Sequence, residues 1–237
     1  MKNTKNKIDK KILIQKILIY ITGLFTLAMG VSFTINSNLG ISPVSSFPFS
    51  LSLVSGLSMG NSVNLFFGFL ILLQFILLRK NFKLSHLSQI VFSFIFGFFT
   101  DFTNFLIGNF SFQYHFGYIG QLLMLIIGII FVSFGVSFYL EAKLISLPPE
   151  GIIFAIMQVQ PKWSFHKIKI IFDCLIVVSA ILITFIFLGN IYGIREGTVI
   201  SAIAIGKLIP YCKKFILAIF KNFNIFTKKE NQNSKET

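Results

Sequence analysis

Six long apolar runs dominate the chain and constrain its fold more strongly than any other feature. The runs are 16 to 22 residues long. They cover residues 17–35, 63–78, 90–107, 119–140, 168–188 and 199–216. A helix of about 20 apolar residues crosses the hydrocarbon core of a bilayer. Only 12% of the residues are charged, about half of what a soluble domain carries. The sequence therefore predicts an all-α integral membrane protein with six transmembrane helices.

Lysine and arginine residues cluster at particular ends of these runs and predict their orientation. Lysines lie at positions 2, 5, 7, 10, 11 and 16, before the first run, and further basic clusters lie at 79–83, 143, 162–169 and 213–214. Basic residues favour the cytoplasmic side. Every cluster lies there if the six runs cross and two shorter apolar stretches, 45–54 and 151–159, do not. Both termini are therefore expected on the cytoplasmic side of a plasma membrane. Because orientation accounts for the net charge of +13, no nucleic-acid partner is expected.

The sequence repeats itself at an offset of 105 positions. Between residues 30–54 and 135–159, eight of twenty-five positions are identical, whereas chance gives about two. The matches include the segment GVSF and the pair Pro43 and Pro148, and a small insertion then aligns Gly97 with Gly206. Each unit contains three crossings, and an odd number turns the second unit upside down. The predicted architecture is two inverted repeats of three helices, each with a short re-entrant or broken-helix segment.

This architecture divides the chain into five parts. They are a basic cytoplasmic tail (1–16), membrane repeat 1 (17–107), an extracellular loop (108–118), membrane repeat 2 (119–220) and a lysine-rich cytoplasmic tail (221–237).

The two short stretches begin with residues typical of helix starts. Ser42-Pro43 precedes the first, and Leu147-Pro148-Pro149-Glu150 precedes the second; proline is suited to the first turn of a helix. A helix start inside a membrane needs protein or a wet cavity beside it, and there it can hold an anion or a carboxylate. The alternative is an amphipathic turn lying flat at each interface. The candidate substrate-binding residues are Ser42, Pro43, Ser45, Ser46, Pro148, Glu150 and Lys207.

Several polar and small residues inside the apolar runs also require an explanation. Ionisable groups at bilayer depth usually face a bundle interior or a cavity. The intramembrane polar candidates are Asn64, Asp101, Lys169 and Asp173. Lys207 lies near the midplane of the last run, so we expect it to pair with Glu150, with Asp173 as the second choice. Headgroup positions for Asp101 and Asp173, and a snorkelling Lys207, are the structural alternatives. The candidate helix-packing residues are Gly30, Gly97, Gly135 and Gly206.

Four segments carry a resemblance to a known family. They are GVSFTINSNLGISPVSSF, SGLSMGNSVNLFFGFLILL, GVSFYLEAKLISLPPEGI and REGTVISAIAIGKLI. With these segments the chain resembles the YczE/YyaS/YitT-like bacterial multipass membrane proteins. The resemblance implies an acidic residue after the second proline motif, here Glu150, and a basic and an acidic residue in the fifth span, here Lys169 and Asp173. The first motif departs from the family pattern, because Val44-Ser45-Ser46 replaces an aromatic and acidic copy. The resemblance implies an architecture rather than an activity.

The sequence contains no constellation that indicates covalent chemistry. His86, His115 and His166 are isolated, and HExxH, GxSxG and GxxxxGK[ST] motifs are absent. We therefore expect no enzymatic activity, no cofactor and no metal. The leading prediction is a transporter or channel for a small molecule or ion, with its site between the repeats. The alternatives are a membrane scaffold that recruits cytoplasmic enzymes, and the solute-binding subunit of a multi-component uptake system. Besides the lipid bilayer, a homo-oligomeric partner is consistent with the sequence.

Overall fold

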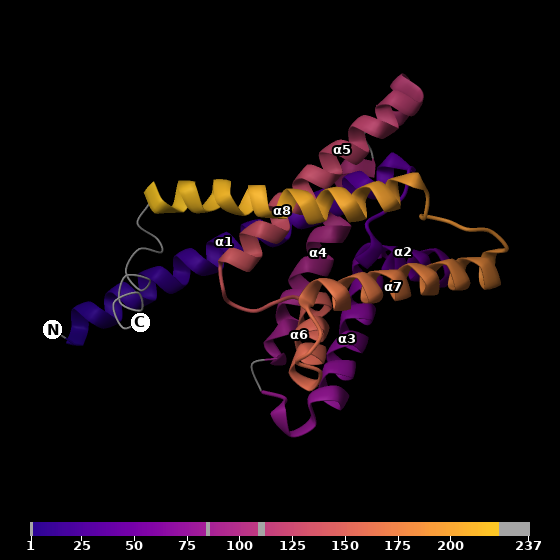
Figure 1. Cartoon of the computed structure of the whole chain (residues 1–237). Coiled ribbons are helices and arrows are strands. Elements are labelled where there is room, and N and C mark those ends of the chain that lie inside the picture. The colour runs from indigo at the N-terminus through magenta and orange to yellow at the C-terminus, as the bar shows by residue number, and fades with distance from the viewer. Residues whose placement is uncertain (1, 84–85, 109–111, 223–237) are drawn as a thin grey trace.

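The computed structural model describes residues 2–83, 86–108 and 112–222, with side chains described for 12–83, 86–108 and 117–219. These residues form eight α-helices and no β-strand (Figure 1). The helices are α1 (Lys2–Ser37), α2 (Pro43–Ser55), α3 (Met59–Leu78), α4 (Ser88–Gly108), α5 (Phe112–Glu141), α6 (Pro148–Val159), α7 (Phe165–Leu188) and α8 (Glu196–Asn222). A 3₁₀ turn, Arg79–Asn81, follows α3. Most of the predicted tail 221–237 and the centre of the predicted loop 108–118 lie outside the described residues.

Five of the helices are long and apolar enough to cross a membrane. Their apolar segments are Ile12–Ser37 in α1, Met59–Asn81 in α3 and its 3₁₀ turn, Ser88–Gly108 in α4, Gly117–Glu141 in α5 and Phe165–Leu188 in α7. Large apolar side chains on these helices point outward; Phe98, Phe105 and Ile186 are each at least 67% exposed. Such surfaces contact lipid chains rather than water. The chain is therefore a multipass membrane protein.

The sixth predicted crossing, 199–216, corresponds to α8 but is not among these five segments. Along its described length α8 carries the charged residues Glu196, Lys207, Lys213, Lys214 and Lys221, and Pro210 lies inside it. This charge is what separates α8 from the other long helices. The sixth crossing therefore stays a prediction. At the other end of the chain, α1 begins at Lys2, so residues 2–16 of the predicted basic tail are helical.

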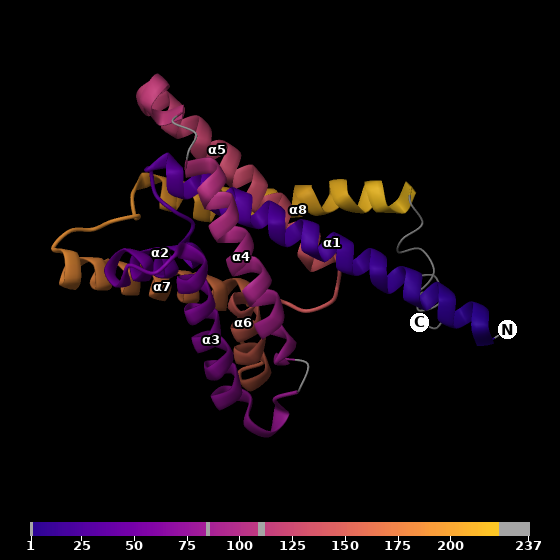
Figure 2. The same ribbon diagram turned by 180° about the vertical axis from the view of Figure 1, so that it is seen from behind.

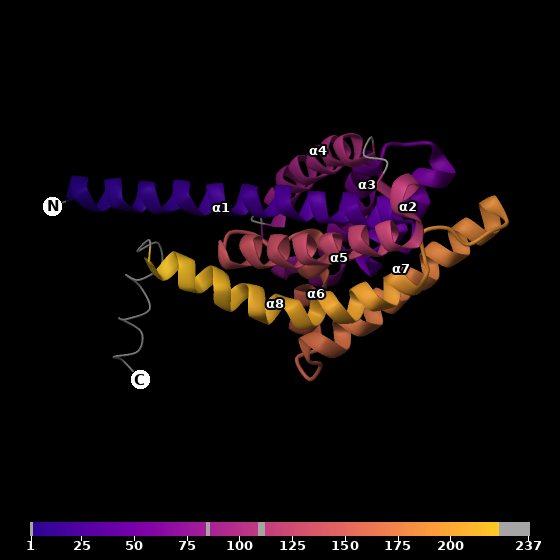
Figure 3. The ribbon, with the colours of Figure 1, turned by 90° about the horizontal axis from the view of Figure 1, so that it is seen from above.

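The centre of the molecule is an antiparallel seam between α1 and α5 (Figures 1 and 3). Glycines allow the two backbones to come close. A Cβ atom added to Gly30 would lie 2.5 Å from the backbone nitrogen of Val132, and one added to Gly135 would collide with the backbone of Leu27. Small residues at such a seam replace side-chain bulk with direct backbone packing. α4 packs on α1, and α8 packs on α5.

The short helices α2 and α6 each pack on a long helix from the other half of the chain. α2 lies along α7, and α6 lies along α3 (Figures 1 and 2). At the second of these contacts, a Cβ atom on Gly151 of α6 would lie 2.8 Å from the side-chain oxygen of Gln74 in α3. The same Gln74 exchanges hydrogen bonds with Gln89 of α4. The two halves of the chain are therefore interleaved and share one core.

Candidate functional site

Both short helices begin with proline and with the same backbone geometry. α2 begins at Pro43 after Ser42, whose φ and ψ are −58° and 146°, and α6 begins at Pro148 after Leu147, with −64° and 158°. The extended residue at the N-cap and the fixed φ of proline at the first helical position explain why a helix starts at each of these places. The helix starts expected from the sequence are thus present, two to three residues before the predicted stretches 45–54 and 151–159.

The two helix starts meet at a cavity of about 130 Å³. Every one of the eight helices, or the turn that leads into it, contributes to the wall, which is mostly apolar. The polar residues that line it are Ser42, Ser45, Tyr139, Glu150, Lys169 and Asp173. The cavity therefore collects polar groups from both halves of the chain in an otherwise apolar interior.

Several of the residues expected from the sequence lie at this cavity, and others lie nearby but outside it. Ser42, Pro43, Ser45, Glu150 and Gly206 line the wall, as do Lys169 and Asp173. Ser46 is buried behind it and donates a hydrogen bond of 2.7 Å to the carbonyl oxygen of Pro43. The carbonyl oxygen of Pro148 accepts a hydrogen bond of 3.3 Å from Gln74, while the neighbouring Pro149 faces the cavity.

Lys207 does not lie where the sequence analysis placed it. Its side chain is exposed on α8 and is absent from the cavity wall, whereas the adjacent Gly206 faces the cavity. Successive residues on a helix point about 100° apart, so the two cannot face the same way. Among the described residues no ion pair joins Lys207 to Glu150, and the expected pair is not formed. The cation that acts electrostatically on Glu150 is Lys169.

Asn64 and Asp101 lie between α3 and α4, away from the cavity. The carboxylate of Asp101 accepts hydrogen bonds from the Ser58 hydroxyl at 2.7 Å and from the Gly60 amide at 2.6 Å. It thus holds the start of α3 against α4 and satisfies one of the donors at that helix start. A Cβ atom on Gly97 would lie 2.6 Å from the side chain of Asn64. By contrast, a Cβ atom on Gly206 would meet nothing within 4 Å.

The charged residues of the cavity are incompletely paired. Lys169 and Asp173, one turn apart on α7, form an ion pair of 3.1 Å. Glu150 sits within their electrostatic reach, but its Oε2 atom is buried and has no hydrogen-bond partner among the described residues. With all three groups ionised, the net charge is −1. A buried polar atom without a partner costs about 1–3 kcal/mol, and more when it is charged, so this oxygen is a candidate contact for a ligand.

Two tyrosines that the sequence analysis did not single out lie beside Glu150. Tyr139 lines the cavity, and Tyr20 packs against it edge to face with 5.9 Å between ring centroids. Both are almost completely buried; the Tyr20 hydroxyl has no partner in the described part of the chain, and the Tyr139 hydroxyl has the Glu150 carboxyl as its hydrogen-bond neighbour. The charge of Glu150 acts on both hydroxyl groups. In an apolar run a tyrosine is typical of a core or interface position, so this cluster can be recognised only in the folded structure.

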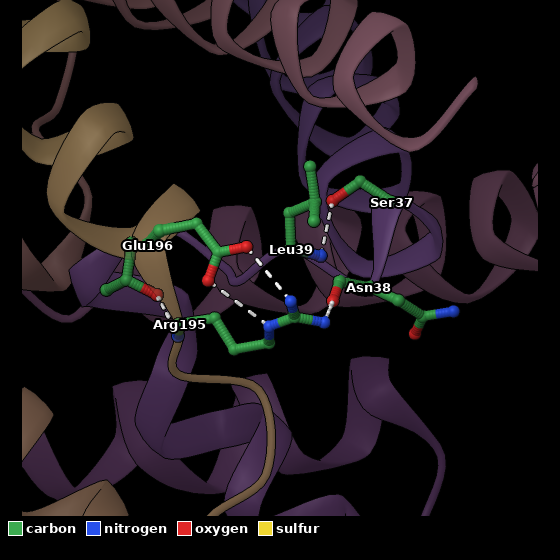
Figure 4. A network of polar contacts seen from close by, with 6 residues as sticks. Ser37, Asn38, Leu39, Arg195 and Glu196 are labelled. Atoms are coloured by element: carbon green, nitrogen blue, oxygen red, sulfur yellow. Dashed lines mark hydrogen bonds and ion pairs between the residues drawn. The ribbon is translucent and has the colours of Figure 1, made fainter. Parts of the chain in front are cut away.

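A second feature that sequence patterns missed is a clamp between two loops, residues 38–41 and 193–198, shown in Figure 4. The Arg195 guanidinium donates to the carbonyl oxygen of Asn38 at 3.0 Å and to the Glu196 carboxylate at 2.9 Å. Two backbone hydrogen bonds run between the loops, from the Gly197 amide to Leu39 at 2.8 Å and from the Ile41 amide to Gly193 at 3.0 Å. This loop clamp ties the start of α8 to the segment that leads into α2.

The glycines of the loop clamp have no room for a side chain. A Cβ atom on Gly197 would lie 2.6 Å from the carbonyl oxygen of Leu39, and one on Gly40 would lie 2.6 Å from the hydroxyl of Thr198. Beside the clamp is a second cavity, of about 340 Å³, whose wall includes Asn38, Gly40 and Arg195. Hydrogen bonds from its own backbone amide and from Arg195 hold the pKa of Glu196 below its usual value. The Arg195–Glu196 pair therefore remains charged at neutral pH.

A family model described as "Family of unknown function (DUF6198)" matches residues 14–214. The chain belongs to this family. Two proteins of Bacillus subtilis (strain 168) are similar to it over most of their lengths. "Uncharacterized membrane protein YczE" is 27% identical over 205 residues, which are 85% of this chain and 87% of YczE. "Uncharacterized protein YyaS" is 28% identical over 166 residues, 70% of this chain and 80% of YyaS.

These relatives confirm the YczE/YyaS-like family expected from the four sequence segments, and the printed name of YczE agrees with a location in a membrane. No solved structure gives a significant match to the chain. The DUF6198 match spans all eight described helices in whole or in part, from α1 to α8. The cavity and the loop clamp both lie inside the matched segment.

Proposed function

We propose that the protein is a plasma-membrane transporter or channel for a small solute or ion, with its binding site in the cavity where α2 and α6 begin. One observation carries this proposal: two short helices from different halves of the chain start at the same cavity, beside the partnerless Oε2 atom of Glu150. Interrupted helices that meet at a central site are the arrangement by which many transporters of inverted-repeat type bind their substrate. On this proposal the protein performs no covalent chemistry.

The contacts of the central seam support an inverted repeat. At the repeat offset of 105, the contact of Gly135 with Leu27 corresponds to the contact of Gly30 with Val132. The packing of α2 on α7 corresponds in the same way to the packing of α6 on α3, and α1 with α4 corresponds to α5 with α8. A twofold relation between the halves accounts for all of these pairs.

The sixth crossing is proposed for α8. The described start of α1 and the end of α8 lie at the same end of the molecule (Figures 1 and 3), as an even number of crossings requires. An ion pair of 2.6 Å between Lys213 and the buried Glu141 of α5 accommodates one of the charges of α8. With six crossings, the basic clusters favour both termini in the cytoplasm.

The proposal is tested by solute flux into proteoliposomes that contain the full-length protein. The solutes are radiolabelled methylammonium, acetate and urea, one for each charge class. At least one of them is expected to enter faster than into protein-free vesicles, and Glu150→Gln should reduce that excess rate by about tenfold or more. Glu196→Gln is the matched control, because it removes an exposed carboxylate that is not part of the cavity wall, and should leave the rate unchanged. Equal entry into vesicles with and without protein for all three solutes contradicts the proposal.

A further inference from the structure

The starts of α2 and α6 offer few hydrogen-bond donors to a ligand. An ordinary helix start presents several free N–H groups that can bind an anion. Here the first helical positions are Pro43 in α2 and Pro148 and Pro149 in α6, which have no N–H group. The amide of Ser45 is already bonded to the carbonyl oxygen of Ser42 at 3.0 Å. These two helix starts are therefore poor anion sites, although their geometry is that of a helix start.

The carboxylate of Glu150 is the group that lacks a partner at the cavity wall. Its Oε2 atom has no hydrogen-bond partner among the described residues, and the neighbouring Tyr139 hydroxyl, which can accept as well as donate, belongs to the same wall. Lys169, the cation of the cavity wall, is paired with Asp173. A ligand that donates hydrogen bonds and carries a positive charge would satisfy these acceptors and neutralise the net charge of −1. A ligand of the opposite kind would face acceptors and an uncompensated carboxylate.

The volume of the cavity and the residues of its wall indicate which kind of cation fits. Phe67 and Phe96, stacked with 5.8 Å between ring centroids, line it together with Val63. Such a wall favours a ligand with an apolar part over a bare inorganic ion. Cavities of about 150 Å³ hold a molecule the size of benzene, so 130 Å³ admits roughly five non-hydrogen atoms. Calcium and magnesium ions take six or more oxygen ligands, and no cluster of three or more His, Cys, Asp or Glu residues that could hold a metal ion occurs in the described part of the chain.

We propose that the cavity binds a small primary ammonium ion, R–NH₃⁺, with the ammonium group on Glu150 and Tyr139 and the alkyl group against Val63, Phe67 and Phe96. Tyr20 supports the site from behind, through its contact with Tyr139. An ammonium group has three donors, so it can bond to Glu150 and Tyr139 together. This inference rests on the proposed function, since it names the substrate class of the same cavity.

The test measures equilibrium binding of radiolabelled n-butylammonium to the full-length protein in lipid nanodiscs, with 1-butanol and butyrate as neutral and anionic ligands of similar size. Butylammonium is expected to bind, and the other two to bind at least tenfold more weakly. Glu150→Gln should weaken butylammonium binding by tenfold or more, because it removes the charge and keeps the shape. Tyr139→Phe should weaken it severalfold through the loss of one hydrogen bond to a charged group. Glu196→Gln should have no effect.

The unliganded variants supply an independent readout. Because the Oε2 atom of Glu150 is buried without a partner, Glu150→Gln should leave the melting temperature of the ligand-free protein unchanged or raise it. A fall instead would mean that the carboxylate is satisfied within the protein and is unavailable to a ligand, which contradicts the proposal. Equal binding of 1-butanol and butylammonium, or equal stabilisation by K⁺ or Mg²⁺, also overturns it, as does a response to protons alone.

Measurements of binding and of flux distinguish a failure of this inference from a failure of the proposed function. If butylammonium binds to the wild-type protein but no solute crosses the membrane, the transport proposal fails and the ligand assignment stands. If acetate or urea crosses in a Glu150-dependent way while butylammonium does not bind, the ligand assignment fails and the transport proposal stands.

Discussion

Asn38 and Lys143 lie 105 positions apart and adopt the same left-handed backbone conformation, with φ angles of 55° and 51°. Each follows the end of a long helix, α1 in one case and α5 in the other. Side chains other than glycine rarely adopt this conformation. The same unusual backbone conformation thus follows two helices, at positions separated by the repeat offset. The two halves of the chain are therefore related in backbone conformation as well as in sequence.

Valine at either of these positions should destabilise the protein. A β-branched side chain in the left-handed region costs about 1–2 kcal/mol, so Asn38→Val and Lys143→Val should lower the free energy of unfolding by similar amounts. Ser146→Val is the control, because Ser146 lies in the same segment as Lys143 and its φ is not positive. Denaturant or SDS titration in detergent measures all three. Unequal effects at positions 38 and 143 would argue against equivalent backbone roles.

The glycine seam between α1 and α5 should respond sharply to one added methyl group. Gly30→Ala places a Cβ atom 2.5 Å from the Val132 backbone, and overpacking of this kind costs about 1–3 kcal/mol. Gly206→Ala, where a Cβ atom meets nothing within 4 Å, should be neutral or slightly stabilising because alanine favours a helix. The thermal midpoint of each variant in the same detergent compares them. If both alanines are tolerated equally, the close approach of the helices is not required.

The two short helices are expected to return to the side from which they start. Leu57→Cys lies in the exposed turn after α2, and Lys162→Cys lies in the exposed turn after α6. In a background without Cys174 and Cys212, a membrane-impermeant thiol reagent should label position 57 from outside intact cells and position 162 only after the membrane is opened. Labelling of both positions from outside would show that one of the short segments crosses, and the six-crossing arrangement would then fail.

The loop clamp should hold the start of α8 in place. Gly197→Ala would push a Cβ atom toward the carbonyl oxygen of Leu39 and break the hydrogen bond between the loops. Amide hydrogen exchange at Ile41 and Gly197 should accelerate, and stability should fall by about 1–3 kcal/mol. Gly68→Ala, on an open face of α3, is the matched control and should change neither quantity. Unchanged exchange at Ile41 in the Gly197 variant would mean that the clamp opens readily in the native protein.

Much of the architecture could be predicted because it depends on local chemistry. Apolar runs and their flanking lysines locate the long helices, and Pro43 and Pro148 mark the helix starts that the structure contains. The weaker prediction was α8: its apolar residues form a run, but its lysines make it less suited to lipid than the other five segments. Depth along a run also says little about which way a side chain points, so Lys207 was expected at the cavity that Gly206 faces.

The parts of the site that could not be predicted depend on contacts between distant segments. The bonds from Gly197 to Leu39 and from Ile41 to Gly193 join backbone atoms, which leave no pattern in side chains. Tyr20 and Tyr139 lie in apolar helices where an aromatic residue is ordinary, and their position beside Glu150 becomes evident only when the neighbours of each hydroxyl are known. The prolines, by contrast, can be identified in the sequence. Their lack of N–H donors bears on ligand binding only because both helix starts lie at one cavity.

Each short helix packs on a long helix from the other half of the chain, so the first half cannot complete its packing until the second half has been synthesised. α7 begins 110 residues after α2 ends, and at about 5–20 residues per second α2 waits about 5–20 s for the helix against which it packs. During that interval the apolar α2 and the Gln74 face of α3 are inserted in the membrane without their partners. The first half is therefore a biosynthetic intermediate that depends on the insertion machinery or on lipid for protection, and a frameshift after α4 would leave a fragment for quality-control proteases to remove.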